Sequence, residues 1–474
     1  MTVDADDALD AVWHALGGGP RPTGVRWAGP AGVLPSRLPT AVLARATVAA
    51  YALAAEELAT ARGLAGGADV VVDSGAVGTA FTSERHLRRG GRPFDSFASL
   101  SRFWRAADGW VRTHGNYPHH QARLLAALAV PDTAADLADA VGRRIAELPA
   151  ATVEDVVTRS AGLAVAVRTP DEWTTHPQGA AVSELPLLSL DRVEGGPPRS
   201  MAPAPDAPRL PAHGVRVLDL TRVIAGPVAT RSLALLGADV LRVDSRGLPE
   251  LEAQHLDTGF GKRSTLLDLA QRADRAAFEE LLSAADVVVT GYRPGALDRF
   301  GLGPPSLLER RPGLVVASLS AWGPAGPWSD RRGFDSLVQA ATGIAMREAA
   351  ADGSPGALPA QALDHGTGYL LAAAVLRGMA SRIRAGGGWS ARLSLAQTAR
   401  WLLHDLPATA SGDQPPGPTA STVGEPSDPA AWCVEIDAPG GRLRHALPAV
   451  TLRGGPRTWA HPPTPWGSDA PRWR

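Results

Sequence analysis

Asp364 is the residue whose type and setting point most directly to covalent chemistry. It lies near the start of an otherwise apolar helix pattern that begins at Ala362. One reading is an N-cap, a carboxylate that accepts backbone N–H bonds. The other is a nucleophile, which activated acyl groups require for covalent relay. The readings are compatible because a helix N-terminus stabilises a carboxylate. Gly366 and Gly368 are expected to give a bulky substrate close access.

Basic residues form a second candidate set, because several lie at or just after predicted strand ends, where parallel sheets bind phosphates. They are Arg222, Arg246, Lys262, Arg263, Arg293 and Arg299. Solvated surface charge is the equally weighted alternative. The first predicted strand is not followed by Gly-x-Gly-x-x-Gly, and the sequence has no Gly-Lys-Ser/Thr phosphate loop. Dinucleotide oxidoreduction and NTP hydrolysis therefore lose support.

Three histidines cluster in one short stretch, at His114, His119 and His120. A metal site is conceivable, but no cysteine lies near and the spacing matches no zinc motif. We therefore favour a loop without metal. The sequence also lacks the Gly-x-Ser-x-Gly elbow of a serine hydrolase.

The elements that must position these residues alternate between strand and helix from residue 214 onward. Runs rich in branched residues predict strands at 215–220, 239–243, 264–269, 287–290 and 314–320. The segments between them predict helices, such as 274–284. This alternation indicates an α/β fold with a Rossmann-like, doubly wound parallel sheet. Its ligand edge would carry Arg222, Arg246 and Arg293.

The N-terminal part is less regular, with one long Ala-rich helix predicted at 40–62. Shorter helices are predicted at 121–128, 134–148 and 153–160. The segment from Leu38 resembles the segment from Leu358 at an offset of 320 residues, which aligns Ala44 with Asp364. The two segments are predicted to share a shape, although a chance match between Ala-rich helices is the alternative.

Bulk composition narrows the class of protein. The chain has 474 residues and a formal net charge of −1, so nucleic acid and acidic membranes are not expected as partners. A single cysteine, Cys433, excludes an intramolecular disulfide framework. The N-terminus lacks a signal-peptide pattern, and apolar stretches are broken by charge. A cytoplasmic location is expected.

Several motifs between residues 213 and 405 resemble family III CoA-transferases, the CaiB/BaiF family. They share one order and spacing: Gly214 to Thr221, Ala225-Gly226-Pro227, Leu236 to Val240, Gly261 to Ser264, Arg293 to Leu297, and Gly333 to Ala340. The resemblance implies transfer of CoA from an acyl-CoA thioester to a free carboxylic acid. It also implies an aspartyl anhydride and then an aspartyl-CoA thioester, formed on Asp364. Coenzyme A is then a substrate, and no tightly bound cofactor is expected.

The resemblance also implies a set of CoA contacts. These fall on Ala225, Ser245, Arg246, Leu267, Asp268, Leu269, Gly291, Tyr292, Arg293, Arg299 and Asp335. Two departures weaken the phosphate contacts: a basic residue often found after the third strand is Ala270 here, and Ser245 stands where a basic residue is expected, so Arg246 must substitute.

The order of the halves departs from the family, because residues 85–185 resemble the later part of the family sequence yet precede the CoA-binding half. The resulting domain prediction is as follows: 1–84, a degenerate partial copy of the large domain; 85–194, a smaller α+β domain and return segment; 195–212, a Pro-rich linker; 213–405, the CoA-binding half; and 406–474, a Pro-rich, partly flexible segment. One active site per chain is expected, and the family's interlocked dimers imply a homodimer.

Two alternative functions stay open. Related racemases carry a histidine just before the acid of the Gly-x-Asp motif, and that position is Phe334 here. A single base cannot exchange a proton on both faces, so 2-methylacyl-CoA isomerisation is disfavoured. The rearranged halves also allow a non-catalytic CoA-binding subunit.

Overall fold

The computed structural model describes residues 3–21, 24–64, 69–94, 97–198, 201, 208–406 and 428–474. Residues 199–200 and 202–207 of the predicted linker (195–212), and residues 407–427 of the predicted C-terminal segment (406–474), lie outside the described residues. In the part of the chain that is described, no helix is long and apolar enough to cross a membrane.

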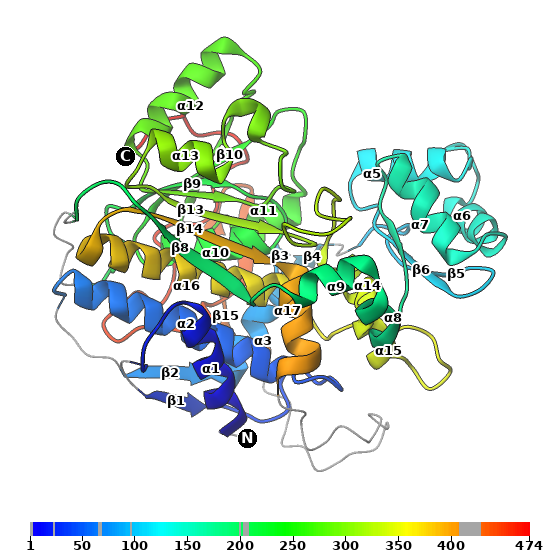
Figure 1. The fold of residues 1–474 in the computed structure, drawn as a ribbon, viewed down its shortest axis with the longest axis horizontal. Helices are drawn as coiled ribbons and strands as arrows, with labels where there is room; N and C mark the ends of the chain where they lie inside the picture. The colour runs from blue at the N-terminus through cyan, green and yellow to red at the C-terminus, as the bar shows by residue number, and fades with distance from the viewer. Residues whose placement is uncertain are drawn as a thin grey trace.

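A seven-stranded sheet forms the centre of the molecule, with strand order β11-β10-β9-β12-β13-β14-β8 (Figure 1). The strands are β8 (Leu188–Val193), β9 (Arg216–Leu220), β10 (Asp239–Asp244), β11 (Lys262–Leu266), β12 (Val287–Thr290), β13 (Val315–Ser320) and β14 (Gly388–Ser394). All neighbouring pairs are parallel except β14 with β8. The predicted α/β class and its parallel sheet are confirmed.

Helices cover both faces of this sheet, as its branched, doubly buried strands require. On one face, α10 (Ala225–Leu235) and α16 (Ala362–Ala385) pack against Val287 and Val289. On the other, α12 (Arg272–Ala284) and α13 (Pro304–Arg310) pack against Val288. Strand order reverses between β9 and β12, so their adjacent carboxyl ends form the switch point where such sheets bind ligands.

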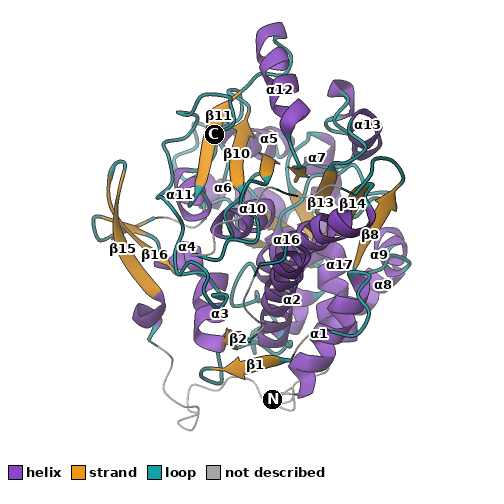
Figure 2. Cartoon of the chain, turned by 90° about the vertical axis from the view of Figure 1, so that its left-hand side faces the viewer, coloured by secondary structure: helices purple, strands orange, loops and turns teal. Residues whose placement is uncertain are grey.

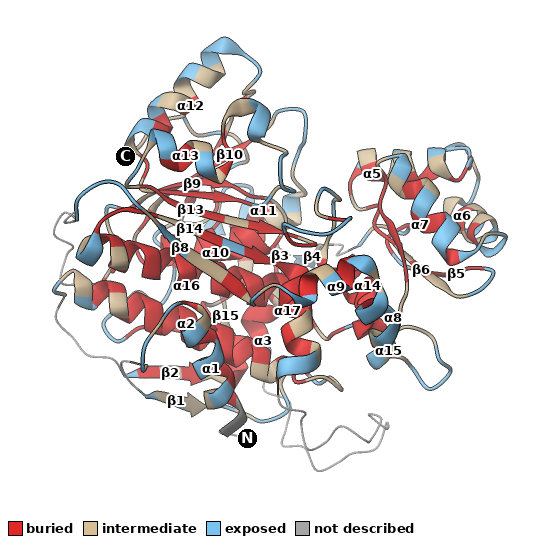
Figure 3. Ribbon diagram, viewed as in Figure 1, coloured by how far each residue is buried: buried red, intermediate tan, exposed pale blue. Residues whose placement is uncertain are grey.

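The N-terminal segment packs beside α16. It contains α1 (Val3–Ala15), β1 (Val25–Ala28), α2 (Thr40–Ala61), β2 (Val70–Asp73), α3 (Ser74–Phe81) and α4 (Ser83–His86). Strands β1 and β2 pair in parallel. Helix α2 is apolar nearly all round, and such a helix must be buried. It lies against α16 and is buried along most of its length (Figures 2 and 3).

A small lobe projects from the main body (Figure 1). It holds the antiparallel strands β5 (Phe103–Arg105), β6 (Trp110–Thr113) and β7 (Ala164–Ala166). Helices α5 (Pro118–Ala127), α6 (Leu137–Ala146) and α7 (Ala150–Arg159) give it a core of its own. The chain then returns through α8 (Pro170–Thr175) and α9 (Pro177–Ser183) to strand β8.

Several short helices lie in the connections between the longer elements. They are α11 (Glu252–Thr258), η1 (Asp298–Phe300), α14 (Asp335–Ala341), α15 (Ile344–Arg347), α17 (Leu395–Arg400) and η2 (Trp401–Asp405). Gly343, with φ of 92°, makes the left-handed turn between α14 and α15. Only glycine adopts that conformation without strain.

The C-terminal residues 428–474 wrap around the main body. A 3-10 turn, η3 (Pro429–Trp432), leads into the hairpin β15 (Cys433–Ala438) and β16 (Gly441–Ala446), which pairs with β3 (Arg88–Arg89) and β4 (Arg92–Pro93). Residues after Trp459 form no helix or strand. Indole N–H groups nevertheless fix them: Trp459 donates to the Arg231 carbonyl, and Trp473 donates to the Leu281 carbonyl.

Candidate active site

Asp364 lies in the first turn of α16, where its side chain is 6% exposed. Its backbone N–H donates to Asp335 Oδ2 at 2.9 Å. The other Asp335 oxygen accepts from Gln339 Nε2 at 2.5 Å. Within the described ranges, no hydrogen bond to the Asp364 carboxyl group is found, so this group is held in place through its backbone and left available for chemistry.

The two neighbouring acids shift each other's ionisation. Burial raises the pKa of Asp364 well above its usual range, and the charges of Asp335 and Glu84 raise it further. Burial also raises the pKa of Asp335, but the N–H of Asp364 and the Gln339 side chain oppose that rise. Asp335 is thus the better hydrogen-bonded of the pair, and the first negative charge resides preferentially on it.

Gly366 and Gly368 lie against neighbouring helices. They let these helices pack closely, whereas the sequence led us to expect that they give a substrate access. A Cβ at Gly368 would lie 2.6 Å from the carbonyl oxygen of Ala225, the first residue of α10. A Cβ at Gly366 would lie 2.7 Å from Leu43 Cδ2 of α2. The two glycines therefore let α16 approach α10 on one side and α2 on the other.

The N-terminal segment supplies a residue to this site that sequence reasoning missed. Glu84 Oε2 lies 3.7 Å from Nε2 of His365, the residue next to Asp364. The His365 ring stacks on Phe81 of α3, with ring centroids 5.2 Å apart. No motif marks Glu84, because its role depends on a contact between two distant parts of the chain.

The structure brings several predicted CoA contacts together at the switch point. Ala225 is buried at the start of α10, after β9. Gly291 follows β12 and lies beside Thr221 at the end of β9, since a Cβ at Gly291 would be 3.4 Å from Thr221 Cβ. Tyr292 is half-buried, and burial together with Asp244 raises its pKa to about 12.

Three predicted cationic contacts are exposed near these strand ends. Arg246 follows β10 and donates to the Leu266 carbonyl at 3.4 Å. Arg299 lies over the Phe300 ring at 4.6 Å. Arg293 follows β12 and forms no ion pair with any described residue. It lines a cavity of about 790 Å³ together with Tyr292 and Leu393.

The other predicted contacts are less available to a ligand. Leu267 is buried in the core beneath α12, and Leu269 is half-buried. Ser245 Oγ accepts from the N–H of Gly247, and Asp268 Oδ1 accepts from the N–H of Ala270. Asp335 lies apart from all of these, against the backbone of Asp364.

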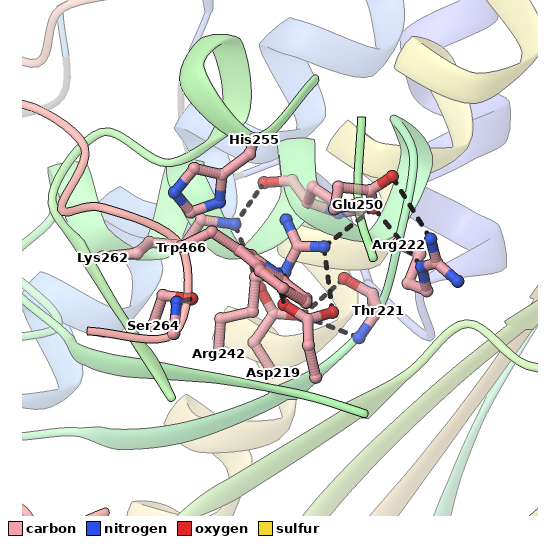
Figure 4. A network of polar contacts seen from close by, with 12 residues as sticks. Asp219, Thr221, Arg222, Arg242, Glu250, His255, Lys262, Ser264 and Trp466 are labelled. Carbon is pink, nitrogen blue, oxygen red and sulfur yellow. Dashed lines mark hydrogen bonds and ion pairs between the residues drawn. The ribbon is translucent and has the colours of Figure 1, made fainter. Parts of the chain in front are cut away.

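Two of the basic candidates are structural and not free for phosphate. Lys262 Nζ is buried 3.0 Å from Asp219 Oδ2 (Figure 4), and burial lowers its pKa to about 8 despite that partner. Arg263 pairs with Asp239 at 2.8 Å. The phosphate reading is therefore wrong for these two, because each side chain is already neutralised by an aspartate.

A buried network braces the end of β9 (Figure 4). Arg242 pairs with Asp244 and with Glu250, each at 2.8 Å. The same Glu250 accepts from the Tyr117 hydroxyl of the small lobe at 2.5 Å, and Arg222 lies over the Tyr117 ring. This network ties the small lobe to the sheet edge where the strand-end candidates lie.

The histidine cluster contacts the loop that leads to Asp335. The His114 ring stacks on Phe334 at 3.9 Å, and His120 approaches the same ring edge-on. Burial and Arg112 lower the pKa of His114 to about 3. Across the described ranges, no group of three or more His, Cys, Asp or Glu side chains is arranged to hold a metal ion.

The known proteins to which this chain is similar include several CoA-transferases. Residues 213–429 match the model of CoA-transferase family III. An acetyl-coenzyme A transferase of Hypoxylon pulicicidum is 30% identical over 330 residues, which cover 65% of this chain and 55% of that protein. An acetyl-CoA:oxalate CoA-transferase of Acetobacter aceti is 33% identical over 215 residues, covering 43% and 55%.

Among solved structures, a CaiB/BaiF family protein of Brucella suis is 28% identical with a TM-score of 0.38, covering 42% of this chain and 56% of that one. The chain spans about half the length of the relatives that it matches.

Proposed function

Because residues 213–429 belong to CoA-transferase family III, we propose that this protein moves CoA from an acyl-CoA thioester to a free carboxylic acid, with Asp364 as the nucleophile. The position of Asp364 carries the proposal. It lies one helical turn from Gly368, which abuts Ala225 at the carboxyl end of β9. A thioester held at that strand edge would thus lie close to an acid whose carboxyl group forms no hydrogen bond with a described residue.

The proposed reaction proceeds through covalent steps. The ionised Asp364 oxygen attacks the thioester carbonyl, and the C–S bond breaks to give a mixed anhydride and CoA thiolate. The thiolate attacks the aspartyl carbonyl and releases the donor acid, leaving an aspartyl-CoA thioester. The acceptor carboxylate attacks that thioester, and its C–S bond breaks to give a second anhydride and CoA thiolate. The thiolate then attacks the acceptor acyl carbon and displaces the Asp364 carboxylate. Acyl-CoA forms and Asp364 is regenerated as a carboxylate.

The raised pKa of Asp364 sets the pH dependence of this proposal. Burial, followed by Asp335 and Glu84, favours the neutral acid. Only the ionised form attacks, so transfer activity rises as the pH rises through the pKa of Asp364. A carboxylate of high pKa is also a stronger nucleophile than an ordinary one once its proton is gone.

We assign the CoA phosphates to Arg246, Arg293 and Arg299. These cations are exposed after β10 and β12, whereas Lys262 and Arg263 are engaged by aspartates. Parallel sheets bind anionic ligands at this edge. The cavity beside Tyr292 and Arg293 gives room for part of the CoA chain.

Trapping with hydroxylamine tests the nucleophile. The protein is incubated with acetyl-CoA, oxalate and hydroxylamine, and the α16 peptide is analysed by mass spectrometry. We expect a hydroxamate at Asp364, and none in Asp364→Asn. A non-catalytic CoA-binding subunit would give no adduct with any acyl-CoA donor. Full transfer activity in Asp364→Asn would disprove the assignment.

Isomerisation of a 2-methylacyl-CoA is the less favoured alternative. Its second base would stand at Phe334, where the nearest imidazole, His114, is stacked flat on the ring and has a pKa lowered to about 3. Deuterium uptake at C2 of the acyl-CoA in heavy water would support it. The family resemblance also leads us to propose a homodimer, which analytical ultracentrifugation tests.

A further inference from the structure

Glu84 is an acid of the N-terminal segment that faces the first turn of α16. Its Oε2 atom lies 3.7 Å from His365 Nε2, with the Glu84 side chain 22% exposed and the His365 side chain 1% exposed. Neither ring nitrogen of His365 forms a hydrogen bond among the described residues. Among the described residues, Glu84 is the acid at ion-pair distance from this buried ring, and the charge of Asp335 also interacts with it.

The position of Glu84 is built by its surroundings. Ser83 Oγ donates to Asp257 Oδ2 at 2.6 Å and fixes α4 to α11. Thr82 Oγ1 and His86 Nε2 are 3.0 Å apart and close the turn between α3 and α4. Phe81, three residues before Glu84, stacks on the His365 ring. The Glu84 carboxylate is therefore held in place and is not a mobile surface group.

Three ionisable groups face Asp364. Asp335 reaches it from α14, Glu84 from α4, and His365 is its neighbour on α16. Farther out, Arg112 of β6 interacts with Asp335. Burial opposes ionisation of Glu84, but its interaction with the His365 ring, followed by the charge of Arg85, outweighs burial and lowers the pKa of Glu84. Glu84 is therefore ionised over a pH range in which Asp364 is not.

We propose that Glu84 is a positioning residue of the transfer site: its carboxylate, supplied by the N-terminal segment, fixes His365 and places a permanent negative charge against Asp364. This inference rests on the proposed function. Two like charges repel when Asp364 is ionised, and this repulsion vanishes when acylation turns Asp364 into a neutral anhydride or thioester. The covalent intermediate is thereby favoured over the free carboxylate.

The test compares three variants with the wild type. Glu84→Gln removes the charge and keeps the size, Glu84→Asp keeps the charge, and Glu57→Gln is the matched control. Glu57 pairs with Arg377 at 3.0 Å, so it also joins the N-terminal segment to α16, but near the opposite end of that helix. Infrared spectra of each protein are recorded over a range of pH. The band that is followed belongs to the protonated Asp364 carboxyl group and is assigned by its absence from Asp364→Asn.

We expect the midpoint of this band to fall by on the order of one pH unit in Glu84→Gln, because a like charge that raises the pKa of Asp364 is removed. Glu84→Asp keeps the charge, so its midpoint should stay close to that of the wild type. Glu57→Gln should leave the midpoint unchanged. The kcat/KM profile should move in the same direction, and less hydroxamate should accumulate at Asp364 in Glu84→Gln.

An unchanged midpoint in Glu84→Gln, or an equal shift in Glu57→Gln, would overturn the inference. The infrared titration needs no substrate, so it decides the role of Glu84 by itself. Absence of any hydroxamate in the wild type would instead overturn the proposed function.

Discussion

Helices α2 and α16 lie side by side and run in the same direction, yet only α16 carries an acid in its first turn. The direction follows from two contacts: Gly366 approaches Leu43 near the start of each helix, and Arg384 pairs with Glu57 near the end of each. Both helices are Ala-rich and largely buried. At the position that the sequence offset matches to Asp364, α2 has the fully buried Ala44.

The chain before each helix differs more than the helices do. Residues 29–39 connect β1 directly to α2, whereas residues 321–361 separate β13 from α16 and include α14. That insertion supplies Asp335, which accepts from the N–H of Asp364. The start of α2 is instead tied down by Glu348 of the loop after α15, which accepts from Ser36 Oγ at 2.7 Å.

The residues around a helix start decide whether an acid there can be reactive. Asp335 accepts a hydrogen bond from the backbone N–H of Asp364, and the negative charge of Glu84 helps to raise the pKa of Asp364. Ala44 has neither an acid of its own nor an equivalent of α14. The N-terminal segment thus has a helix that matches α16 but no acid at its start, and it contributes Glu84 to the surroundings of Asp364.

The largest effect is expected when α16 is made like α2. Asp364→Ala should reduce transfer by on the order of 10³-fold or more, since the nucleophile is lost. The double variant Asp364→Ala/Ala44→Asp should stay equally inactive in acyl-CoA transfer assays. Recovery of transfer in the double variant would show that the helix alone makes the site.

Placing an acid in α2 with Ala44→Asp should lower the stability of the folded protein. Ala44→Asp buries a carboxyl group without a prepared partner, and we expect a loss of about 3 kcal/mol in the free energy of unfolding measured in urea. Burial raises the folded-state pKa of the new group above its unfolded value of about 3.9. The loss should be smallest below that pH and grow as the pH rises. The neutral control Ala44→Asn should show no such pH dependence.

Alanine substitutions at Gly366 and Gly368 distinguish the packing of α16 against α2 from its packing against α10. Gly368→Ala should lower stability by about 2 kcal/mol, because its Cβ meets the Ala225 carbonyl oxygen, which cannot move freely. Gly366→Ala should cost under about 1 kcal/mol, because its Cβ meets only the tip of Leu43. Both gain the same helix propensity, so the difference in urea midpoints isolates packing. Equal losses would contradict the close contact with α10.

A smaller loss of activity than that of Asp364→Ala should follow from removing the charge of Asp335, whose carboxylate accepts the Asp364 N–H. Asp335→Asn keeps an oxygen that can accept the Asp364 N–H but removes the charge, so kcat/KM should fall by about tenfold, or 1.4 kcal/mol. The activity profile should also move to lower pH, because the charge of Asp335 helps to raise the pKa of Asp364. The exposed Asp352→Asn serves as a control and should change neither quantity.

Much of the fold could be predicted from the sequence because its signals are local. The branched runs at 215–220 and 287–290 became β9 and β12, and the apolar pattern at 40–62 became α2. Boundaries were less certain: the strand predicted at 264–269 is β11, Lys262–Leu266. That shift places Lys262 and Arg263 inside a strand, where aspartates engage them, and not at its ligand edge.

The candidate site could be predicted only in part. Asp364 was found because an acid in an apolar helix start stands out within a few residues of sequence. The contact of Asp335 with the Asp364 backbone was not expected, and neither were the packing roles of Gly366 and Gly368. Each depends on which helix lies against α16, and residue spacing carries no such information.

By itself, the sequence determined the parallel α/β sheet, the order of its strands along the chain and the acid at the start of α16. The tertiary structure decided how that acid behaves. Glu84 and His365 are far apart in the chain but 3.7 Å apart in space, and Asp335 reaches Asp364 from another helix. Ionisation depends on burial and on charges within a few ångströms, so the pKa of Asp364 is a property of the folded chain.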